Sequence, residues 1–382
     1  MTSRELLGAA DVTDQQLAMM VADLLGEETV ALLDVRVDAV DYELPAITTA
    51  GRWWVTGHAT TSNGEEPFRI FVKQVQNWSR SPQFAMVPPE IREVAAASVP
   101  WRTEASVYRS DLADRLPEGL SMPRALAVID LDALSSAVWL EEVPLREWPW
   151  DHERFERAAY LLGRLAGSSR VAPLAQIDDH QWSVLDYLHG RFEHQVVPML
   201  HDDALWAHPL LVNAFGDGLR DRMRAALAQV PAWVEELADA PHHVGHGDAC
   251  PNNLLGADRR DAFVLIDFGF WKPLPLGFDL GQLLLGDVQI GRRGAQDLDI
   301  VDARIVPAYV AGLNDEGHAV DPARVARLHA LQMAVFTGLS SMPFEHLGSP
   351  PSPELERLAA TRAAITTYCL GRVEATDGAA PR

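Results

Sequence analysis

Apolar and polar residues follow two different patterns along this chain. Between residues 30 and 142, short apolar runs are separated by turn signals such as Ser62-Asn63-Gly64, which is typical of strands joined by hairpins. From residue 153 onward, apolar residues recur every three or four positions, which is typical of helices. A helical segment also follows Thr13, a good N-cap. The change of pattern predicts an α+β chain with a sheet-forming N-terminal part and a mostly helical remainder.

The same pattern gives approximate bounds for the elements. The predicted strands or extended segments are residues 30–42, 46–55 (strand, turn, strand), 68–73, 124–130 and 136–140. The predicted helices are residues 13–25, 89–97, 103–116, 153–166, 182–197, 205–237 (interrupted at Pro209 and Pro231), 302–313, 322–339 and 353–373. Residues 77–100 form an insertion with a loop at 79–88. We expect a five-stranded antiparallel sheet with one main packed helix, an N-terminal lobe of residues 1–142, a C-terminal lobe of residues 143–382, and a disordered tail at 374–382.

Composition and charge narrow the possible functions. The chain has 382 residues and a formal net charge of −22, so it lacks the basic excess that nucleic-acid binding requires. No apolar run reaches the length of a membrane span, and the first residues lack the apolar core of a signal peptide. Cys250 and Cys369 are far apart in sequence and have no metal-ligand spacing. These features predict a cytoplasmic protein that binds neither nucleic acid nor membrane.

Two polar motifs separated by a predicted hairpin carry the candidate chemistry: His246-Gly247-Asp248-Ala249-Cys250-Pro251-Asn252-Asn253 and Val264-Leu265-Ile266-Asp267-Phe268-Gly269. The hairpin would bring Asp248, Asn253 and Asp267 together at one end. Phosphoryl transfer needs such a group: one carboxylate accepts the proton of an attacking hydroxyl, while an amide oxygen and a second carboxylate hold Mg²⁺ on the nucleotide phosphates. The alternative is that these residues merely occupy polar turns, where they are common. The order and spacing of the motifs favour catalysis.

The motifs resemble those of the aminoglycoside phosphotransferase family, the small-molecule branch of the protein-kinase-like fold. That branch carries His-Gly-Asp where protein kinases carry His-Arg-Asp, as this chain does at residues 246–248. The resemblance implies a bilobal fold, with ATP or GTP as phosphate donor and Mg²⁺ as cofactor. It implies that Asp248 is the catalytic base, that Asn253 and Asp267 bind the metal, and that His246 and Asp279 support the loop. A simple N-cap is the other interpretation of Asp279.

Lys73 is the predicted phosphate ligand. It ends an apolar strand, as the Lys of the kinase motif Val-Ala-Ile-Lys does, whereas an exposed edge residue is the ordinary interpretation of such a Lys. Of the 32 Lys and Arg residues only Lys73 and Lys272 are lysines, so each is informative; the position of Lys272 stays open between substrate and solvent. Glu104 begins an apolar helical stripe and needs a buried partner, which we expect to be Lys73. Glu90 and Glu93 are rivals for this pairing, and Glu104 is otherwise an ordinary first-turn residue.

The remaining nucleotide-binding predictions are less specific. Gly51 lies in the predicted turn at residues 48–52, where a kinase has its phosphate-covering loop, but no Gly-x-Gly-x-x-Gly is present and a plain surface hairpin fits equally well. Glu142 marks the hinge, where backbone groups would meet the adenine. Leu255 and Ile266 of the hairpin complete the predicted nucleotide site.

The predicted function is transfer of the γ-phosphate of ATP or GTP to a hydroxyl of a small molecule, such as an aminoglycoside, an amino sugar or a related alcohol. The short segment between Asp267 and Asp279 leaves no room for the activation segment of a protein kinase. An inactive nucleotide-binding regulatory protein is the other alternative; the missing glycines favour it and the complete catalytic set opposes it. Asp287, Asp297 and Asp299 favour a cationic acceptor, unless they only keep the surface soluble.

Overall fold

The strands of the N-terminal part form one antiparallel sheet. The computed structural model describes residues 3–41 and 46–377, and within them the sheet has the order β1-β2-β3-β6-β5 with every neighbouring pair antiparallel. Its strands are β1 (Ala31–Ala39), β2 (Thr49–Thr61), β3 (Gly64–Gln76), β5 (Ala125–Asp132) and β6 (Ser135–Glu141). The predicted five-stranded sheet and the α+β class are confirmed. Tyr42, the predicted end of the first extended segment, lies outside the described residues.

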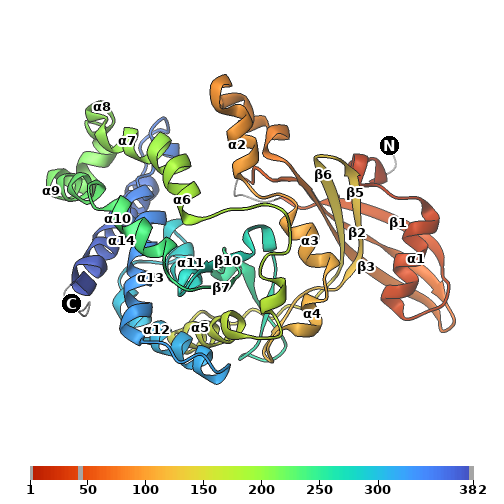
Figure 1. The fold of residues 1–382 in the computed structure, drawn as a ribbon. Coiled ribbons are helices and arrows are strands. Elements are labelled where there is room, and N and C mark those ends of the chain that lie inside the picture. Colours follow the sequence, from red (N-terminus) through yellow and green to blue (C-terminus); the bar gives the residue numbers. More distant parts are fainter. Residues whose placement is uncertain (1–2, 42–45, 378–382) are drawn as a thin grey trace.

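The sheet buries a different core on each face, because successive side chains of a strand point to opposite sides. In β6, Trp139 belongs to a core shared with the N-terminal helix α1 (Asp14–Leu25), and its neighbour Val138 belongs to the larger core shared with the helical part of the chain. Thr13 is the N-cap of helix α1, as the sequence predicts, and it forms a capping box with Gln16. The short helix η1 (Ser3–Ala10) precedes α1. Figure 1 shows α1 on the outer side of the sheet, away from the helices.

The sequence predicted one helix over residues 103–116, and this prediction is wrong because the chain forms two helices there. The chain forms α3 (Thr103–Arg109) and α4 (Leu112–Arg115), separated at Ser110. The Ser110 hydroxyl donates to the carbonyl of Val107 and accepts the N–H of Leu112, which replaces helical backbone bonds and lets the chain bend.

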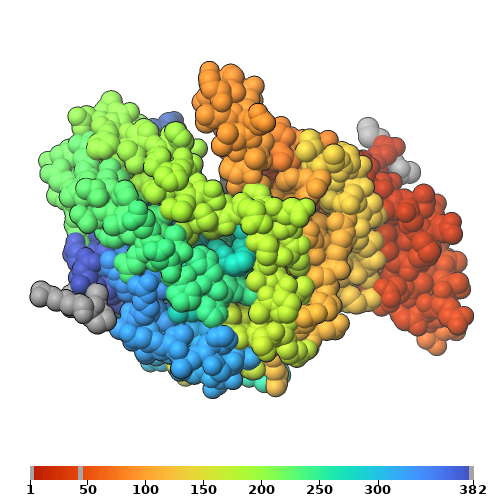
Figure 2. All heavy atoms as spheres, in the orientation of Figure 1, coloured from red at the N-terminus to blue at the C-terminus, as the bar shows by residue number. Residues whose placement is uncertain are grey.

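The insertion after β3 projects from the body of the molecule as an arm (Figures 1 and 2). It contains the short helices η2 (Trp78–Arg80), η3 (Pro82–Met86), η4 (Pro89–Ile91) and α2 (Arg92–Ser98). The helix predicted at 89–97 is confirmed, whereas the predicted loop at 79–88 includes two 3₁₀ turns.

The remainder of the chain is mainly helical, as predicted. Its longer helices and the helical segments near them are α5 (His152–Gly167), η5 (Ala172–Leu174), α6 (Val184–Tyr187), the π-helix η6 (Leu188–Val196), α7 (Val197–His201), α8 (Asp203–Trp206), α9 (Pro209–Leu227), α10 (Val230–Ala238), α11 (Phe278–Gln289), α12 (Leu298–Asp315), α13 (Pro322–Phe336) and α14 (Pro353–Asp377). Further 3₁₀ helices are η7 (Pro251–Asn253), η8 (Phe268–Phe270), η9 (Gly338–Ser340) and η10 (Phe344–His346). Because α14 continues to Asp377, the predicted start of the tail at residue 374 is wrong; residues 378–382 lie outside the described part. No helix in residues 3–41 and 46–377 is long and apolar enough to cross a membrane.

Small strand pairs set the position of the two polar motifs. The predicted hairpin is present as β8 (Leu254–Gly256) and β9 (Phe263–Leu265), and β9 also pairs in parallel with β4 (Leu120–Ser121). Before and after it, β7 (His242–Gly245) pairs with β10 (Lys272–Pro275). The sequence did not predict β4, β7 and β10, which are short and depend on partners far away in the chain. The first motif therefore lies between β7 and β8, and the second between β9 and β10.

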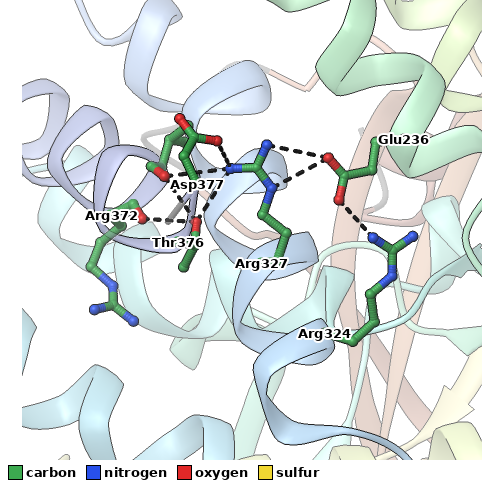
Figure 3. A network of polar contacts seen from close by, with 7 residues as sticks. Glu236, Arg324, Arg327, Arg372, Thr376 and Asp377 are labelled. Atoms are coloured by element: carbon green, nitrogen blue, oxygen red, sulfur yellow. Dashed lines mark hydrogen bonds and ion pairs between the residues drawn. The ribbon is translucent and has the colours of Figure 1, made fainter. Parts of the chain in front are cut away.

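Arg327 joins three helices of the C-terminal part, α10, α13 and α14. Its guanidinium lies on α13 and contacts Glu236 of α10 at 3.2 Å, together with Thr376 and Asp377 of α14 (Figure 3). Arg324 reaches the same glutamate at 2.6 Å but is 40% exposed, against 13% for Arg327.

We expect Arg327→Met to lower the free energy of unfolding by about 2 kcal/mol, because it removes several charge-assisted hydrogen bonds from a partly buried site. Arg324→Met should cost less than about 1 kcal/mol, since exposed ion pairs contribute little. Urea unfolding of both variants would check this, and equal losses would contradict the assignment of Arg327 as the main link.

Candidate active site

The first motif forms a loop whose backbone is hydrogen-bonded to a buried carboxylate. Asp279, in the first turn of α11, accepts the backbone N–H groups of His246 and Gly247, both at 2.8 Å. The His246 ring lies 2.9 Å from the carbonyl oxygen of Ile266, which links the loop to the second motif. Gly247 has φ +81°, a conformation that favours glycine. The N-cap of α11 is Gly277, so Asp279 braces the loop and is not a simple cap.

Asp248 and Asn253 are joined within this loop. The Asn253 side-chain amide donates to the backbone oxygen of Asp248 at 2.8 Å and to its carboxylate at 2.9 Å. These bonds fix the carboxylate and leave the amide oxygen of Asn253 as the end available to a ligand. Burial raises the pKa of Asp248 to about 6. A carboxylate with a pKa closer to neutrality is a more effective proton acceptor than an exposed one.

Lys73, Glu104 and Asp267 form an ion-pair cluster between the sheet and the second motif. The Lys73 ammonium lies 2.6 Å from Glu104 and 3.1 Å from Asp267, and the side chains of Lys73 and Glu104 are 7% and 5% exposed. Burial lowers the pKa of Lys73, but Asp267 and Glu104 outweigh it and leave the pKa above its ordinary value. The predicted pairing with Glu104 is confirmed; its rivals Glu90 and Glu93 are exposed on the projecting arm.

The Asp267 backbone adopts a conformation that costs energy. Its φ of +61° makes it the one non-glycine residue with positive φ among residues 3–41 and 46–377, and such strain of roughly 1–3 kcal/mol is concentrated at functional sites. Burial raises the pKa of Asp267, but Lys73 reverses this and holds the pKa below its usual value. The carboxylate is therefore ionised at neutral pH.

The donor set at this site fits Mg²⁺. A cavity of about 160 Å³ is lined by Asp248, Asn253 and Asp267, which provide carboxylate and amide oxygens, the hard ligands that Mg²⁺ prefers. In nucleotide sites Mg²⁺ takes few protein ligands and completes its shell with phosphate oxygens and water. Asn253 and Asp267 would supply the protein ligands here.

The rest of the cavity wall comes from the first motif, from α11 and from Ile290, the residue that follows α11. It consists of Cys250, Asn252, Gln282, Gly286, Gln289 and Ile290. The α11 residues are spaced by four and three or four positions, so they lie on one face of the helix. Sequence reasoning missed them, although this spacing after Asp279 was visible. Burial raises the pKa of Cys250 to about 12, so its thiol stays protonated at neutral pH.

The prediction that Gly51 lies in a turn is wrong. Strand β2 begins at Thr49, and the β1–β2 connection spans residues 40–48, of which 42–45 lie outside the described residues. Gly51 sits at a bulge in the pairing with β3, where the ring of Trp53 covers it: a Cβ atom here would meet that ring at 2.3 Å. Pairing with β3 extends the strand through the predicted turn, and the glycine makes room for the indole.

Arg52 is a basic residue near the cluster that sequence reasoning missed. It lies directly opposite Lys73 in the antiparallel pair of β2 and β3, so both side chains project from the same face of the sheet. Its positive charge acts on Lys73, Glu104 and Asp267. The alternation of side chains along β2 could have revealed it only once the register with β3 was known.

The remaining predicted nucleotide residues, Glu142, Leu255 and Ile266, are not among the residues that line the cavity. The Glu142 side chain is paired with Arg69 at 2.5 Å, just after the end of β6. Leu255 and Ile266 are half-buried in the hairpin, and the N–H of Ile266 donates to the carbonyl of Asn253 at 3.1 Å. Their contact with a nucleotide stays a prediction.

More than half of the chain matches a known protein family. The model of the phosphotransferase enzyme family matches residues 102–313, which include Glu104, both polar motifs and Asp279. The chain belongs to this family. Similar solved structures include an aminoglycoside phosphotransferase from Alicyclobacillus acidocaldarius (15% identity, TM-score 0.52, covering 97% of this chain and 99% of that one) and a choline kinase from Cryptosporidium parvum (12% identity, TM-score 0.50, covering 90% of each chain). These likenesses show a kinase-like fold. A comparison with curated proteins found no match.

Replacing Lys73 by Arg is expected to lower kcat/KM for the nucleotide by roughly tenfold or more, about 1.4 kcal/mol of transition-state stabilisation. The compact ammonium lies between two carboxylates in a buried site, where a planar guanidinium cannot take the same place. Steady-state kinetics would measure the loss, with Arg36→Lys on the exposed face of β1 (73% exposed) as a control that should not change. Wild-type kinetics for Lys73→Arg would show that the site does not require a lysine.

Proposed function

We propose that this phosphotransferase moves the γ-phosphate of ATP or GTP, with Mg²⁺, to a hydroxyl of a small molecule. The observation that carries the proposal is the convergence of the Lys73–Glu104–Asp267 cluster with the Asp248–Asn253 pair on a braced loop. Phosphoryl transfer depends on positioning and charge neutralisation, which this arrangement supports. We also propose that the lobes meet at residues 142 and 143, and that the reaction takes place in the cytoplasm, where these nucleotides are abundant.

Each residue has a distinct part in the proposed reaction. The Asp248 carboxylate accepts a hydrogen bond from the acceptor hydroxyl and orients its oxygen towards the γ-phosphorus. It takes the proton as the new O–P bond forms, while the bond from the γ-phosphorus to the β–γ bridging oxygen breaks and the nucleoside diphosphate leaves with that oxygen. Asn253 holds that carboxylate in place. Lys73 neutralises phosphate charge, and Arg52 adds positive charge on the same face. When bound at Asn253 and Asp267, Mg²⁺ offsets the charge of the phosphate oxygens.

The segment after Asp267 favours a small acceptor over a peptide. It passes directly into β10, which pairs with β7, and reaches α11 with no long loop that could serve as a docking platform. A nucleotide-binding regulatory protein remains the second candidate, because the phosphate-covering glycines are missing. The intact positions of Asp248, Asn253 and Asp267 support turnover instead.

The cavity wall favours an acceptor recognised through its hydroxyl groups. Among the described lining residues the carboxylates are Asp248 and Asp267, while Gln282, Gln289 and Asn252 present carboxamides that can donate to and accept from hydroxyls.

The acids considered for a cationic acceptor, Asp287, Asp297 and Asp299, do not line this cavity. Asp297 pairs with Arg293 at 2.7 Å, Asp287 faces the charges of Arg292 and Arg293, and Asp299 is exposed on α12. A positively charged acceptor would gain steering from the net charge of −22, without a dedicated carboxylate in this cavity.

The test is a panel of aminoglycosides, amino sugars, choline-like alcohols, neutral sugars and macrolides, incubated with Mg-ATP or Mg-GTP and scored for phosphorylated product by mass spectrometry. We expect phosphorylation of at least one hydroxyl compound. Transfer to peptides or proteins alone would contradict the small-molecule proposal, and nucleotide binding without any turnover would favour the regulatory alternative.

A further inference from the structure

The second lysine of the chain is buried beside the connection between α5 and α6. We call this connection, residues 168–183, the strap. The Lys272 side chain is 3% exposed; its ammonium donates to the carbonyl of His180 at 2.7 Å and lies 3.5 Å from the carboxylate of Asp178, which is 8% exposed. The lysine that the sequence left between substrate and solvent therefore faces neither. It binds the strap.

Asp178 also reaches the sheet-bearing part of the molecule. Its other carboxylate oxygen accepts the hydroxyl of Thr103, a fully buried residue that begins α3. The next residue along α3 is Glu104, the partner of Lys73. Figure 1 shows the strap passing α3 on its way from α5 to α6. One carboxylate thus joins α3, the strap and, through Lys272, strand β10.

Strand β10 lies next to the loop of the first motif, residues 246–253, which is the catalytic loop of the proposed function. Lys272 is paired with Gly245 of β7, and His246 of the loop follows directly. The strap is fixed to the same segment a second time, because the indole of Trp271 donates to the carbonyl of Leu174 at 2.9 Å. The strap is therefore attached to Trp271 and Lys272, in the segment that follows Asp267.

We propose that Asp178 and Lys272 are positioning residues that set Glu104, through Thr103, relative to Asp267 and the catalytic loop. The inference rests on the proposed function, in which Lys73 must hold both carboxylates at once. Contacts of 2.6 and 3.1 Å from one ammonium require α3 to be placed closely against residues from another part of the chain.

Helix α3 needs such a support at its start. It is seven residues long and has no side-chain hydrogen bond at its N-cap, Arg102. Near its other end, Tyr108 packs edge-on against Phe268, with ring centroids 5.6 Å apart. This contact places the second half of the helix beside the second motif, while the Thr103–Asp178 bond places the first residue. Together they fix both the position and the rotation of the helix that carries Glu104.

A purely structural role would not require these residue types. Apolar side chains of similar volume often replace a buried ion pair without loss of stability, so the pair is a weak device for stability alone. Every other residue among the 32 Lys and Arg of the chain is an Arg, yet a compact ammonium is kept here and at Lys73. An ion pair combined with directional hydrogen bonds specifies geometry, which a catalytic cluster needs.

The first test is Thr103→Val, which keeps the shape of the side chain and removes only the donor to Asp178. In the ligand-free protein we expect amide hydrogen exchange in residues 104–109 to accelerate by tenfold or more. Thr103→Ser, which retains the hydroxyl, should exchange like the wild type. Thr366→Val is the matched control. Thr366, on α14, is equally buried and its hydroxyl donates to the carbonyl of Gly338 at 2.8 Å, so its replacement should leave exchange in α3 unchanged. Unchanged exchange in α3 of Thr103→Val would overturn the proposal.

The second test separates positioning from general structure through a double-mutant cycle with Glu104→Gln. Thr103→Val alone should lower kcat/KM for Mg-ATP by at least threefold, but by less than twofold in the Glu104→Gln background, because the strap acts through Glu104. Effects that multiply independently would assign Asp178 and Thr103 a structural role and overturn the proposal. If the wild type does not use nucleotide, the proposed function fails, and the exchange measurement still decides whether Asp178 fixes α3.

Discussion

Asp248→Asn is expected to lower turnover by roughly 10²-fold or more while nucleotide affinity stays within a few-fold of wild type. The amide keeps the size of the side chain and can still contact Asn253, but it cannot accept the proton of the acceptor hydroxyl. Because this proton moves only as the new bond forms, the loss should be in kcat and not in nucleotide binding.

Steady-state turnover and calorimetric nucleotide titration would separate these two quantities. Asp258→Asn is a suitable control, since it makes the same change at a residue of the β8–β9 turn whose side chain is 76% exposed. Wild-type turnover in Asp248→Asn would remove this residue from the proposed mechanism.

Asp267→Asn is expected to weaken binding of the magnesium–nucleotide complex by about tenfold or more, because it replaces a charged side chain, the proposed metal ligand, with a neutral one. Binding of nucleotide without magnesium should change much less. The variant also removes one of the two carboxylates that hold Lys73. The ammonium would keep its other partner, Glu104, which lies at 2.6 Å.

Titration with nucleotide in the presence and absence of magnesium would measure the difference. Asp261→Asn, in the β8–β9 turn where Asp261 pairs with Arg259, provides the comparison and should behave like the wild type. If Asp267→Asn kept the full dependence of affinity on magnesium, the metal ligand would have to be sought elsewhere in the cavity.

The centre of the site could be predicted from sequence because its geometry is local. Asp248 and Asn253 lie within one loop, and a hairpin of ordinary strand and turn residues returns the chain to Asp267. Lys73 and Glu104 are far from that loop, but each carried a signal of its own: the rarity of lysine and the apolar stripe that follows the glutamate. These signals predicted their pairing, which the structure contains at 2.6 Å.

Most of the features that the sequence did not predict depend on the register between strands or on contacts between residues far apart in the chain. The turn assigned to Gly51 disappeared because β2 pairs with β3 beyond it, and the same pairing places Arg52 beside Lys73. The bond between Asp178 and Thr103 joins residues from different elements that no periodicity relates. The break at Ser110 is local, but it depends on the orientation of a hydroxyl, which apolar spacing does not encode.

The most direct measurement of the central claim follows the γ-phosphate itself. Nucleotide labelled at the γ-position would be incubated with the protein, magnesium and a mixture of hydroxyl-bearing small molecules, and the label would be traced to nucleotide, small-molecule and protein fractions. We predict label in a small-molecule product that is lost when magnesium is chelated or when Asp248→Asn replaces the wild type. Label that stays in the nucleotide, or moves only to protein, would contradict the account.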